Sequence, residues 1–229
     1  LYPPHLLGAL FLDSHALLSW SAYVHCLIAA AGAFVLARHH KLSHAAAVLA
    51  GLVYGCSPFL VYYHQAIHGL IALAFLPWVI WLSWTAVERA SLRRWAAGAI
   101  VLALQMYAGH LQFVLYTGLL VALAVVFGVE HVNIRARVKN GLLVVLQGGL
   151  ALLLYAPQLL ASYVLWRHSL RSSLSPDDLT NSMQVEALGL DDLVETMLPN
   201  FFGGPSLHDF WYPEFLGVAV ILLVLVGIQ

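Results

Sequence analysis

Long apolar segments alternate with short polar breaks along most of this chain. Six complete apolar segments occupy residues 16–36, 45–63, 69–87, 95–108, 113–129 and 141–166, and a seventh begins at Phe215. A helix of about 20 apolar residues is long enough to cross the hydrocarbon core of a bilayer. The pattern therefore predicts an all-α, polytopic transmembrane helical bundle with about seven spans.

Two regions outside these segments also predict helices. Pro3 and Pro4 permit a helix that starts with them, so we expect a short interfacial helix from about Pro4. Ser175 and Pro176, followed by two aspartates, have the form of a helix start within the polar stretch 167–213. We interpret residues 1–229 as a single transmembrane domain and 167–213 as an extracytoplasmic loop within it.

The basic residues predict the orientation of the spans. Eight of the ten fall in alternate connections: Arg38 and Lys41; Arg89, Arg93 and Arg94; Arg135, Arg137 and Lys139. The connections between them, 62–68 and 107–112, contain no basic residue. Because cytoplasmic loops are enriched in Lys and Arg, the three basic connections are predicted to be cytoplasmic.

The stretch 95–129 needs a turn near Gly109 and His110 to keep this alternation. One continuous helix would put Arg93 and Arg135 on opposite sides of the membrane. A re-entrant hairpin that enters from the cytoplasmic side would also preserve the charge pattern, so that alternative stays open.

Composition agrees with a membrane location. Apolar residues make up 62% of the chain and charged residues 9%, with a mean hydropathy of +0.85. Ten basic and eleven acidic side chains cannot cover the surface of a soluble domain of this size. We therefore predict a multi-pass protein of the plasma (bacterial inner) membrane. No basic patch with interleaved aromatic residues indicates a nucleic-acid partner.

The two cysteines and the ends of the chain add two further expectations. Cys26 and Cys56 both lie in apolar segments, which favours membrane-buried thiols over a disulfide. The chain starts at Leu1 and ends within an apolar run, so we interpret it as an internal piece of a longer protein.

The sequence contains no motif of a soluble enzyme. The remaining candidate residues for binding or catalysis lie at the predicted extracytoplasmic ends of the spans. Gln105, His110 and Gln112 form the first candidate cluster, able to hold a phosphate or sugar hydroxyls. The alternative is an interfacial turn in which these side chains only cap exposed helix ends.

Other polar residues offer weaker candidates. His64 and His68 have the spacing of a metal pair, but no nearby acid or thiol completes a site, so we predict no metal ligand set. Asp13 is a candidate general base or an exposed interfacial carboxylate. We expect His39, His40 and His44 to be solvated. Gln147, Gln158 and Pro157 suggest a kinked helix that faces protein.

Several short motifs, taken in order, resemble the YfhO-type family of bacterial membrane proteins. Gly109-His110-Leu111-Gln112 resembles the Gly-His-Pro-Gln turn of that family, with leucine in place of proline. The other motifs are Tyr2-Pro3-Pro4-His5-Leu6-Leu7, Leu36-Ala37-Arg38 with Leu42-Ser43, Leu76-Pro77-Trp78, and Leu198-Pro199-Asn200-Phe201-Phe202-Gly203-Gly204. Together they cover nearly the whole chain.

The resemblance implies a GT-C-like glycosyltransferase. Such an enzyme moves a sugar from a polyprenyl-phosphate carrier to a glycan or glycolipid acceptor of the cell envelope, on the outer face. In the GT-C superfamily an acid in the first outer loop usually acts as base or as ligand of a divalent cation. Here Asp13 is only a weak stand-in for that acid, which we expect outside this chain. His68, Gln105, His110, Gln112 and Asn200 are the candidate substrate-binding residues.

Two other classes of function stay open. A transporter or flippase of lipid-linked envelope precursors would show repeated halves with broken helices and polar groups near mid-membrane. The sequence contains no such repeat, which favours the enzyme. A non-catalytic membrane scaffold is the third alternative.

Overall fold

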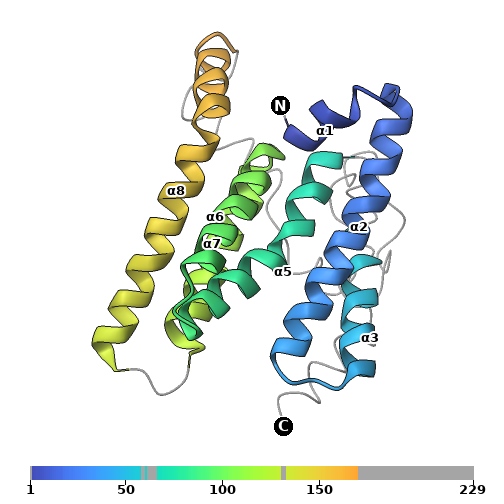
Figure 1. The fold of residues 1–229 in the computed structure, drawn as a ribbon. Coiled ribbons are helices and arrows are strands. Elements are labelled where there is room, and N and C mark those ends of the chain that lie inside the picture. Colours follow the sequence, from blue (N-terminus) through green and yellow to red (C-terminus); the bar gives the residue numbers. More distant parts are fainter. Residues whose placement is uncertain (1, 58–59, 61–65, 130–132, 170–229) are drawn as a thin grey trace, which may run out of the picture.

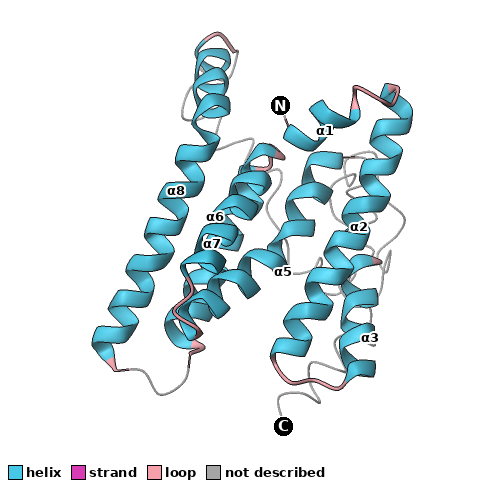
Figure 2. Cartoon of the chain, in the orientation of Figure 1, coloured by secondary structure: helices cyan, strands magenta, loops and turns pink. Residues whose placement is uncertain are grey.

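The structure is a computed structural model, and it describes residues 2–57, 60, 66–129 and 133–169. All regular structure in these residues is helical (Figure 2), which confirms the all-α prediction. The seven helices are α1 (Pro3–Gly8), α2 (Ser14–His39), α3 (His44–Gly55), α5 (Ile67–Glu88), α6 (Leu92–Tyr107), α7 (Leu111–Phe127) and α8 (Ile134–Arg167).

Three of these helices are long and apolar enough to cross a membrane. They are α2, α5 and α8, with 26, 22 and 34 residues. The apolar helices α3 and α7, with 12 and 17 residues, are shorter than the roughly 20 residues that a full span needs. The described part of the chain thus has three helices of spanning length, which suits a multi-pass membrane protein.

Side-chain caps set the start of four helices. The side chains of Asp13, Ser43, Ser91 and Asn133 each accept a hydrogen bond from the backbone N–H three residues further on. An N-cap of this kind satisfies one of the N–H groups that the first helical turn leaves without a partner. The cap residue directly before each of these helices therefore determines where the helix begins.

Two predicted segments have different limits in the structure. The segment predicted over 45–63 is wrong as one helix, because α3 ends at Gly55. Pro58 follows closely in the sequence, and a proline disfavours helical conformation in the residue before it. The segment predicted over 141–166 begins earlier, because Asn133 caps α8. Arg135, Arg137 and Lys139 consequently lie in the first turns of α8 rather than in a connection.

Successive helices run in alternate directions (Figure 1). The connections α2–α3 and α5–α6, the end of α7 and the start of α8 lie at one end of the bundle, which we call the basic end. The helix α1, the start of α5 and the α6–α7 turn lie at the opposite end, which we call the outer end. This arrangement agrees with the alternation inferred from the charges, and the turn predicted at Gly109 and His110 is present.

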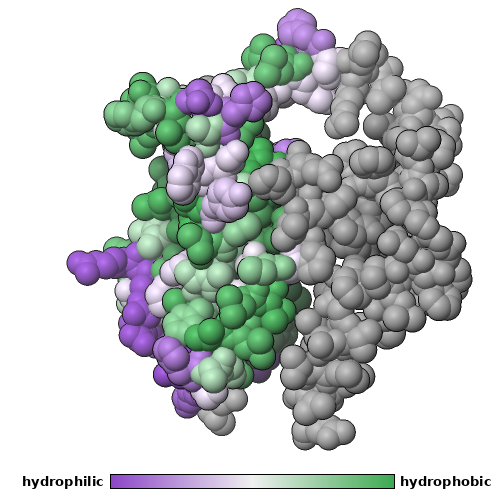
Figure 3. All heavy atoms as spheres, turned by 90° about the vertical axis from the view of Figure 1, so that its right-hand side faces the viewer, coloured by the Kyte–Doolittle hydropathy of each residue, from purple (hydrophilic) through white to green (hydrophobic). Residues whose placement is uncertain are grey.

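The central helix is α5, which packs against α2, α6 and α7. Thirteen of its residues are buried, against four in the longer α8. The peripheral helices of the bundle are α3, which packs on α2, and α8, which packs on α6 and α7. Figure 3 shows hydrophobic residues over much of the described surface on the α2–α3 side, with hydrophilic residues mainly toward its upper and lower ends.

Glycines allow α2 and α3 to approach closely. A Cβ at Gly51 would lie 2.8 Å from the carbonyl oxygen of Ala30, and one at Gly55 would lie 2.7 Å from the Cβ of Ala30. Two glycines four residues apart are common where two membrane helices pack with their backbones close together. The sequence analysis above did not use this signal, although Gly51 and Gly55 display it plainly.

Tyrosine hydroxyls donate to carbonyls near both helical prolines. Pro77 has no N–H, so the carbonyl of Leu73 lacks its helical partner and accepts from the Tyr54 hydroxyl at 2.8 Å. Near Pro157, the Tyr107 hydroxyl donates to the Leu154 carbonyl at 3.0 Å. The helix α8 continues through Pro157.

Gln147 faces protein, as predicted. Its Oε1 accepts from the Ser83 hydroxyl at 2.7 Å, and its Nε2 donates to the Trp95 carbonyl at 2.9 Å. This buried amide therefore links α8 to α5 and α6.

The prediction that His39 is solvated is wrong, because its side chain is 14% exposed and its Nε2 lies 3.3 Å from Oε2 of Glu88.

Both cysteines are free, as predicted. Cys26 is half-buried and Cys56 is exposed, so only Cys26 is covered within the described helices.

Candidate functional site

The turn between α6 and α7 places His110 at the outer end. Gly109 has a φ of +94°, a left-handed conformation that favours glycine, and this reverses the chain in a few residues. His110 is the N-cap residue of α7, and it makes no side-chain cap hydrogen bond. Its imidazole is therefore directed to other partners.

His110 stacks on two rings from different elements. The ring centroids of His68 and His110 are 5.4 Å apart with an interplanar angle of 20°. The centroids of His110 and Phe113 are 4.0 Å apart at 18°. His68 is exposed and belongs to the first turn of α5, whereas His110 is half-buried. The fold thus brings together two predicted binding residues that are far apart in the sequence.

Burial lowers the pKa of His110 below its usual value of 6.5, and the neighbouring His68 lowers it further. The His110 imidazole is consequently neutral at pH 7, with one ring nitrogen as donor and the other as acceptor. Such a group suits hydroxyls better than it suits a permanent negative charge.

Gln105 lies inside the bundle rather than at the surface. Its side chain is fully buried, and its Nε2 donates to the carbonyl of Ala72 at 2.8 Å and to the hydroxyl of Thr117 at 2.7 Å. Its Oε1 is buried and has no hydrogen-bond partner in the described part of the chain. Gln105 therefore links α5, α6 and α7 beneath the His110 turn.

Two further predicted residues, Gln112 and Asp13, make hydrogen bonds to residues near them in the chain. Gln112 is exposed, and its Nε2 donates to the Tyr116 hydroxyl at 2.7 Å on the same helix. The two amides of the predicted cluster thus have separate partners, Gln105 inside the bundle and Gln112 on its own helix. The exposed Asp13 carboxylate accepts from the backbone N–H of Ala16 at 2.9 Å and caps α2. Asn200, His64 and residues 170–213 of the predicted loop lie outside the described residues.

A hydrogen-bonded network near the outer end was missed by the sequence analysis. The Tyr2 hydroxyl lies 2.8 Å from Nε2 of the buried His25, and Nδ1 of His25 lies 2.6 Å from the Ser21 carbonyl oxygen. His5 Nε2 lies 2.6 Å from the Ser21 hydroxyl. The network therefore joins α1 to α2 through four polar side chains.

A sequence signal for half of this network existed. Ser21 and His25 are four residues apart inside an apolar segment, so they lie on one helical face. Tyr2 and His5 could not be added from the sequence, because their contacts depend on how α1 folds back on α2. Burial lowers the pKa of His5 and raises that of Tyr2, so both side chains are neutral at pH 7.

The described residues hold no group of three or more His, Cys, Asp or Glu side chains placed to bind a metal ion. The chain matches no protein-family model, no curated protein and no solved structure at a significant level.

Proposed function

We propose that this chain is part of a membrane glycosyltransferase of the YfhO type, with a GT-C-like fold. It transfers a sugar from a polyprenyl-phosphate carrier to a glycan or glycolipid acceptor of the cell envelope, at the extracytoplasmic face of the plasma membrane. The observation that carries the proposal is the stacked pair of His68 and His110 at the outer end. The motif resemblance, in which His110 belongs to the Gly-His-Leu-Gln turn, supports the same conclusion.

The chemistry of this proposal assigns a binding role to the histidine pair. The neutral His110 imidazole both donates and accepts, so it is suited to orient sugar hydroxyls. In the transfer, the acceptor oxygen forms a bond to the anomeric carbon while the bond from that carbon to the phosphate oxygen breaks. The acceptor proton passes to a base, for which Asp13 is the candidate within this chain, and polyprenyl phosphate leaves.

One experiment tests the proposal directly. The protein is reconstituted in proteoliposomes with a labelled polyprenyl-phosphate sugar and envelope glycolipid, and labelled acceptor is measured for wild type, His110→Ala and His15→Ala. His15 is the matched control, since it is an exposed histidine of α2 close to the outer end. We expect transfer to fall about tenfold in His110→Ala, about the effect of one lost hydrogen bond, and to persist in His15→Ala.

Two outcomes count against the proposal. Movement of the intact lipid-linked sugar across the bilayer without transfer would overturn the enzyme in favour of a transporter. Unchanged transfer in His110→Ala would remove His110 from the site.

One observation favours the transporter as a second candidate. His25 is a buried ionisable residue within α2, a helix of spanning length, and such residues often mark substrate or proton paths. His25→Ala separates the two functions, since a transporter would lose movement of the lipid-linked sugar while an enzyme would keep some transfer.

A further inference from the structure

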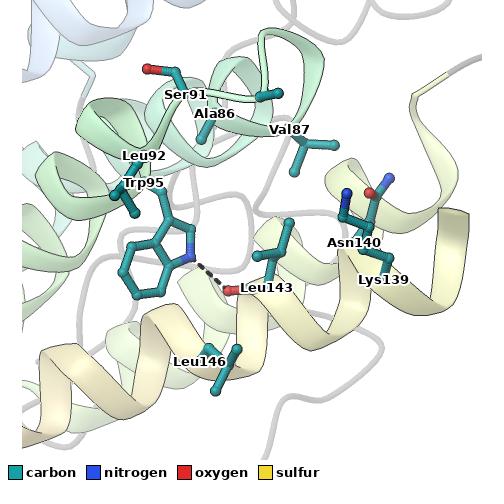
Figure 4. A pocket seen from close by; sticks show the side chains of 10 residues that line it. Ala86, Val87, Ser91, Leu92, Trp95, Lys139, Asn140, Leu143 and Leu146 are labelled. Atoms are coloured by element: carbon teal, nitrogen blue, oxygen red, sulfur yellow. Dashed lines mark hydrogen bonds between the residues drawn. The ribbon is translucent and has the colours of Figure 1, made fainter.

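A pocket of about 440 Å³ lies at the basic end, on the opposite side of the bundle from the histidine pair. It is formed by the α5–α6 turn, the start of α6 and the first turns of α8 (Figure 4). Its volume is within the range of about 300–1,000 Å³ that small-molecule sites usually have. Since α6 continues from the pocket residue Trp95 to Tyr107, about 18 Å of helix separates this pocket from the outer end.

Apart from Ser91 and one polar end, the walls of the pocket are apolar. They include Val87, Leu92, Trp95, Leu143 and Leu146. The indole N–H of Trp95 donates to the Leu143 carbonyl at 2.9 Å, so its one donor is already used and the ring is held in place. These side chains present only hydrocarbon surface to a ligand, and such a surface suits an acyl chain.

One end of the pocket is polar. Figure 4 shows Lys139 and Asn140 side by side there, away from Trp95 and Leu146. Lys139 is exposed and carries an ammonium group with three donors, whereas Asn140 is buried, with its Nδ2 directed to the Val125 carbonyl at 3.5 Å. A cation at one end of an apolar pocket fits an amphiphile with an anionic head group.

The charge around the pocket has the matching sign. The three connections of the basic end and the adjoining helix turns contain eight Lys and Arg residues against two acids, Glu88 and Glu130. Arg94 precedes Trp95 in the chain, and its buried Nη1 has no hydrogen-bond partner among the described residues. Basic pockets between membrane helices on the cytoplasmic side are typical sites for anionic lipid head groups.

We propose that this pocket binds one anionic phospholipid from the membrane leaflet next to the basic end. An acyl chain lies along Trp95, Leu143 and Leu146, and the phosphate lies at the Lys139 ammonium group. The site is independent of the proposed transferase activity, because it lies at the other end of the bundle and shares no residue with it.

Lipid-dependent thermal stability tests this site. The purified chain in neutral detergent is titrated with phosphatidylglycerol, with phosphatidylcholine or with inorganic phosphate, and the shift of the unfolding midpoint is recorded. Two pairs of variants are compared. Lys139→Gln is matched with Lys41→Gln, a basic residue of the same end outside the pocket, and Leu146→Trp is matched with Leu142→Trp. Leu142 and Leu146 are both more than half exposed on α8, but only Leu146 lines the pocket.

Phosphatidylglycerol is expected to raise the midpoint more than phosphatidylcholine does, and phosphate alone is expected to have no effect. Lys139→Gln should weaken the apparent affinity for phosphatidylglycerol about fivefold, the effect of one cation near an anionic lipid surface. Lys41→Gln should leave it unchanged. Leu146→Trp should abolish the shift with both lipids, because the larger ring fills the space for the acyl chain, and Leu142→Trp should retain it.

The proposal is overturned if phosphatidylcholine acts as well as phosphatidylglycerol in wild type and in Lys139→Gln. It is also overturned if inorganic phosphate alone produces the full shift, because the pocket would then bind a free anion rather than a lipid. The midpoint of each variant without lipid reports whether it is folded, and a variant that fails this control is replaced by Lys139→Met or Leu146→Phe.

Discussion

At the scale of single residues, His110 connects the candidate site to the stability of the fold. Burial and the neighbouring His68 lower its pKa in the folded state below the usual value of 6.5. The folded chain therefore binds fewer protons at this position than the unfolded chain does. The resulting contribution to stability is complete above pH 6.5 and is lost as the pH falls from 6.5 toward the folded pKa.

Acidification is consequently expected to destabilise the protein below pH 6.5. The thermal midpoint in detergent should fall more between pH 7.5 and pH 5.5 for wild type than for His110→Asn, which removes this group. His15→Asn, at an exposed position of α2, should keep the wild-type slope. A slope unchanged by His110→Asn would contradict the burial of a neutral imidazole. The pKa values of His5 and His40 are lowered by burial too, so part of the slope should remain.

Ala90 is a second residue with a measurable consequence. Its φ is +47°, in the left-handed region, where it follows the end of α5. A non-glycine residue is strained there, whereas glycine is not, and helices often end with glycine in this place. Ala90→Gly is therefore expected to raise the free energy of unfolding by about 0.5–1 kcal/mol.

Denaturant titration in mixed micelles measures this change. The control is Ala97→Gly inside α6, which should lower the free energy of unfolding by about 1 kcal/mol, because glycine in a helix interior has the larger entropy to lose. If both variants were destabilised alike, the left-handed conformation of Ala90 would be contradicted.

At the scale of elements, the α2–α3 pair depends on the absence of side chains at Gly51 and Gly55. Gly55→Ala would place a Cβ 2.7 Å from the Cβ of Ala30 and 2.9 Å from the Cys26 carbonyl oxygen, and backbone must shift to relieve this. We expect a loss of about 1–3 kcal/mol, as for other overpacked sites. Gly148→Ala in α8 is the control, since a Cβ there meets nothing within 4 Å and the helix should gain stability. Equal thermal midpoints for the two variants would contradict the close packing.

The hydrogen bond from Tyr54 to Leu73 links α3 to α5 at Pro77. Tyr54→Phe leaves the Leu73 carbonyl without a partner, which should cost about 0.5–1.5 kcal/mol. In a Pro77→Ala background, the restored N–H at position 77 can satisfy that carbonyl, so the cost of Tyr54→Phe should be smaller. A double-mutant cycle measures this coupling, and strict additivity of the two changes would contradict it.

At the scale of the whole molecule, the long apolar segments of the sequence predicted most of the described helices. The starts of α2 and α8 depend on the N-caps Asp13 and Asn133, which are local signals that the sequence analysis did not use. Contacts between distant segments could not be predicted. The stacking of His68 on His110 and the network between Tyr2 and His25 depend on how α1, α5 and α7 pack, and no spacing in the sequence encodes that.

The orientation of the molecule in the membrane is the last prediction, and it separates two full spans from a re-entrant hairpin over 95–129. In a background with Cys26 and Cys56 replaced by serine, Leu111→Cys marks the outer end and Leu92→Cys the basic end, and both positions are exposed. Because basic connections are cytoplasmic, a membrane-impermeant maleimide should label position 111 on intact cells, and position 92 only after permeabilisation. The re-entrant alternative requires position 111 to be shielded from the outside. Labelling of position 92 on intact cells would reverse the orientation, and it would move both the histidine pair and the lipid pocket to the opposite faces of the membrane.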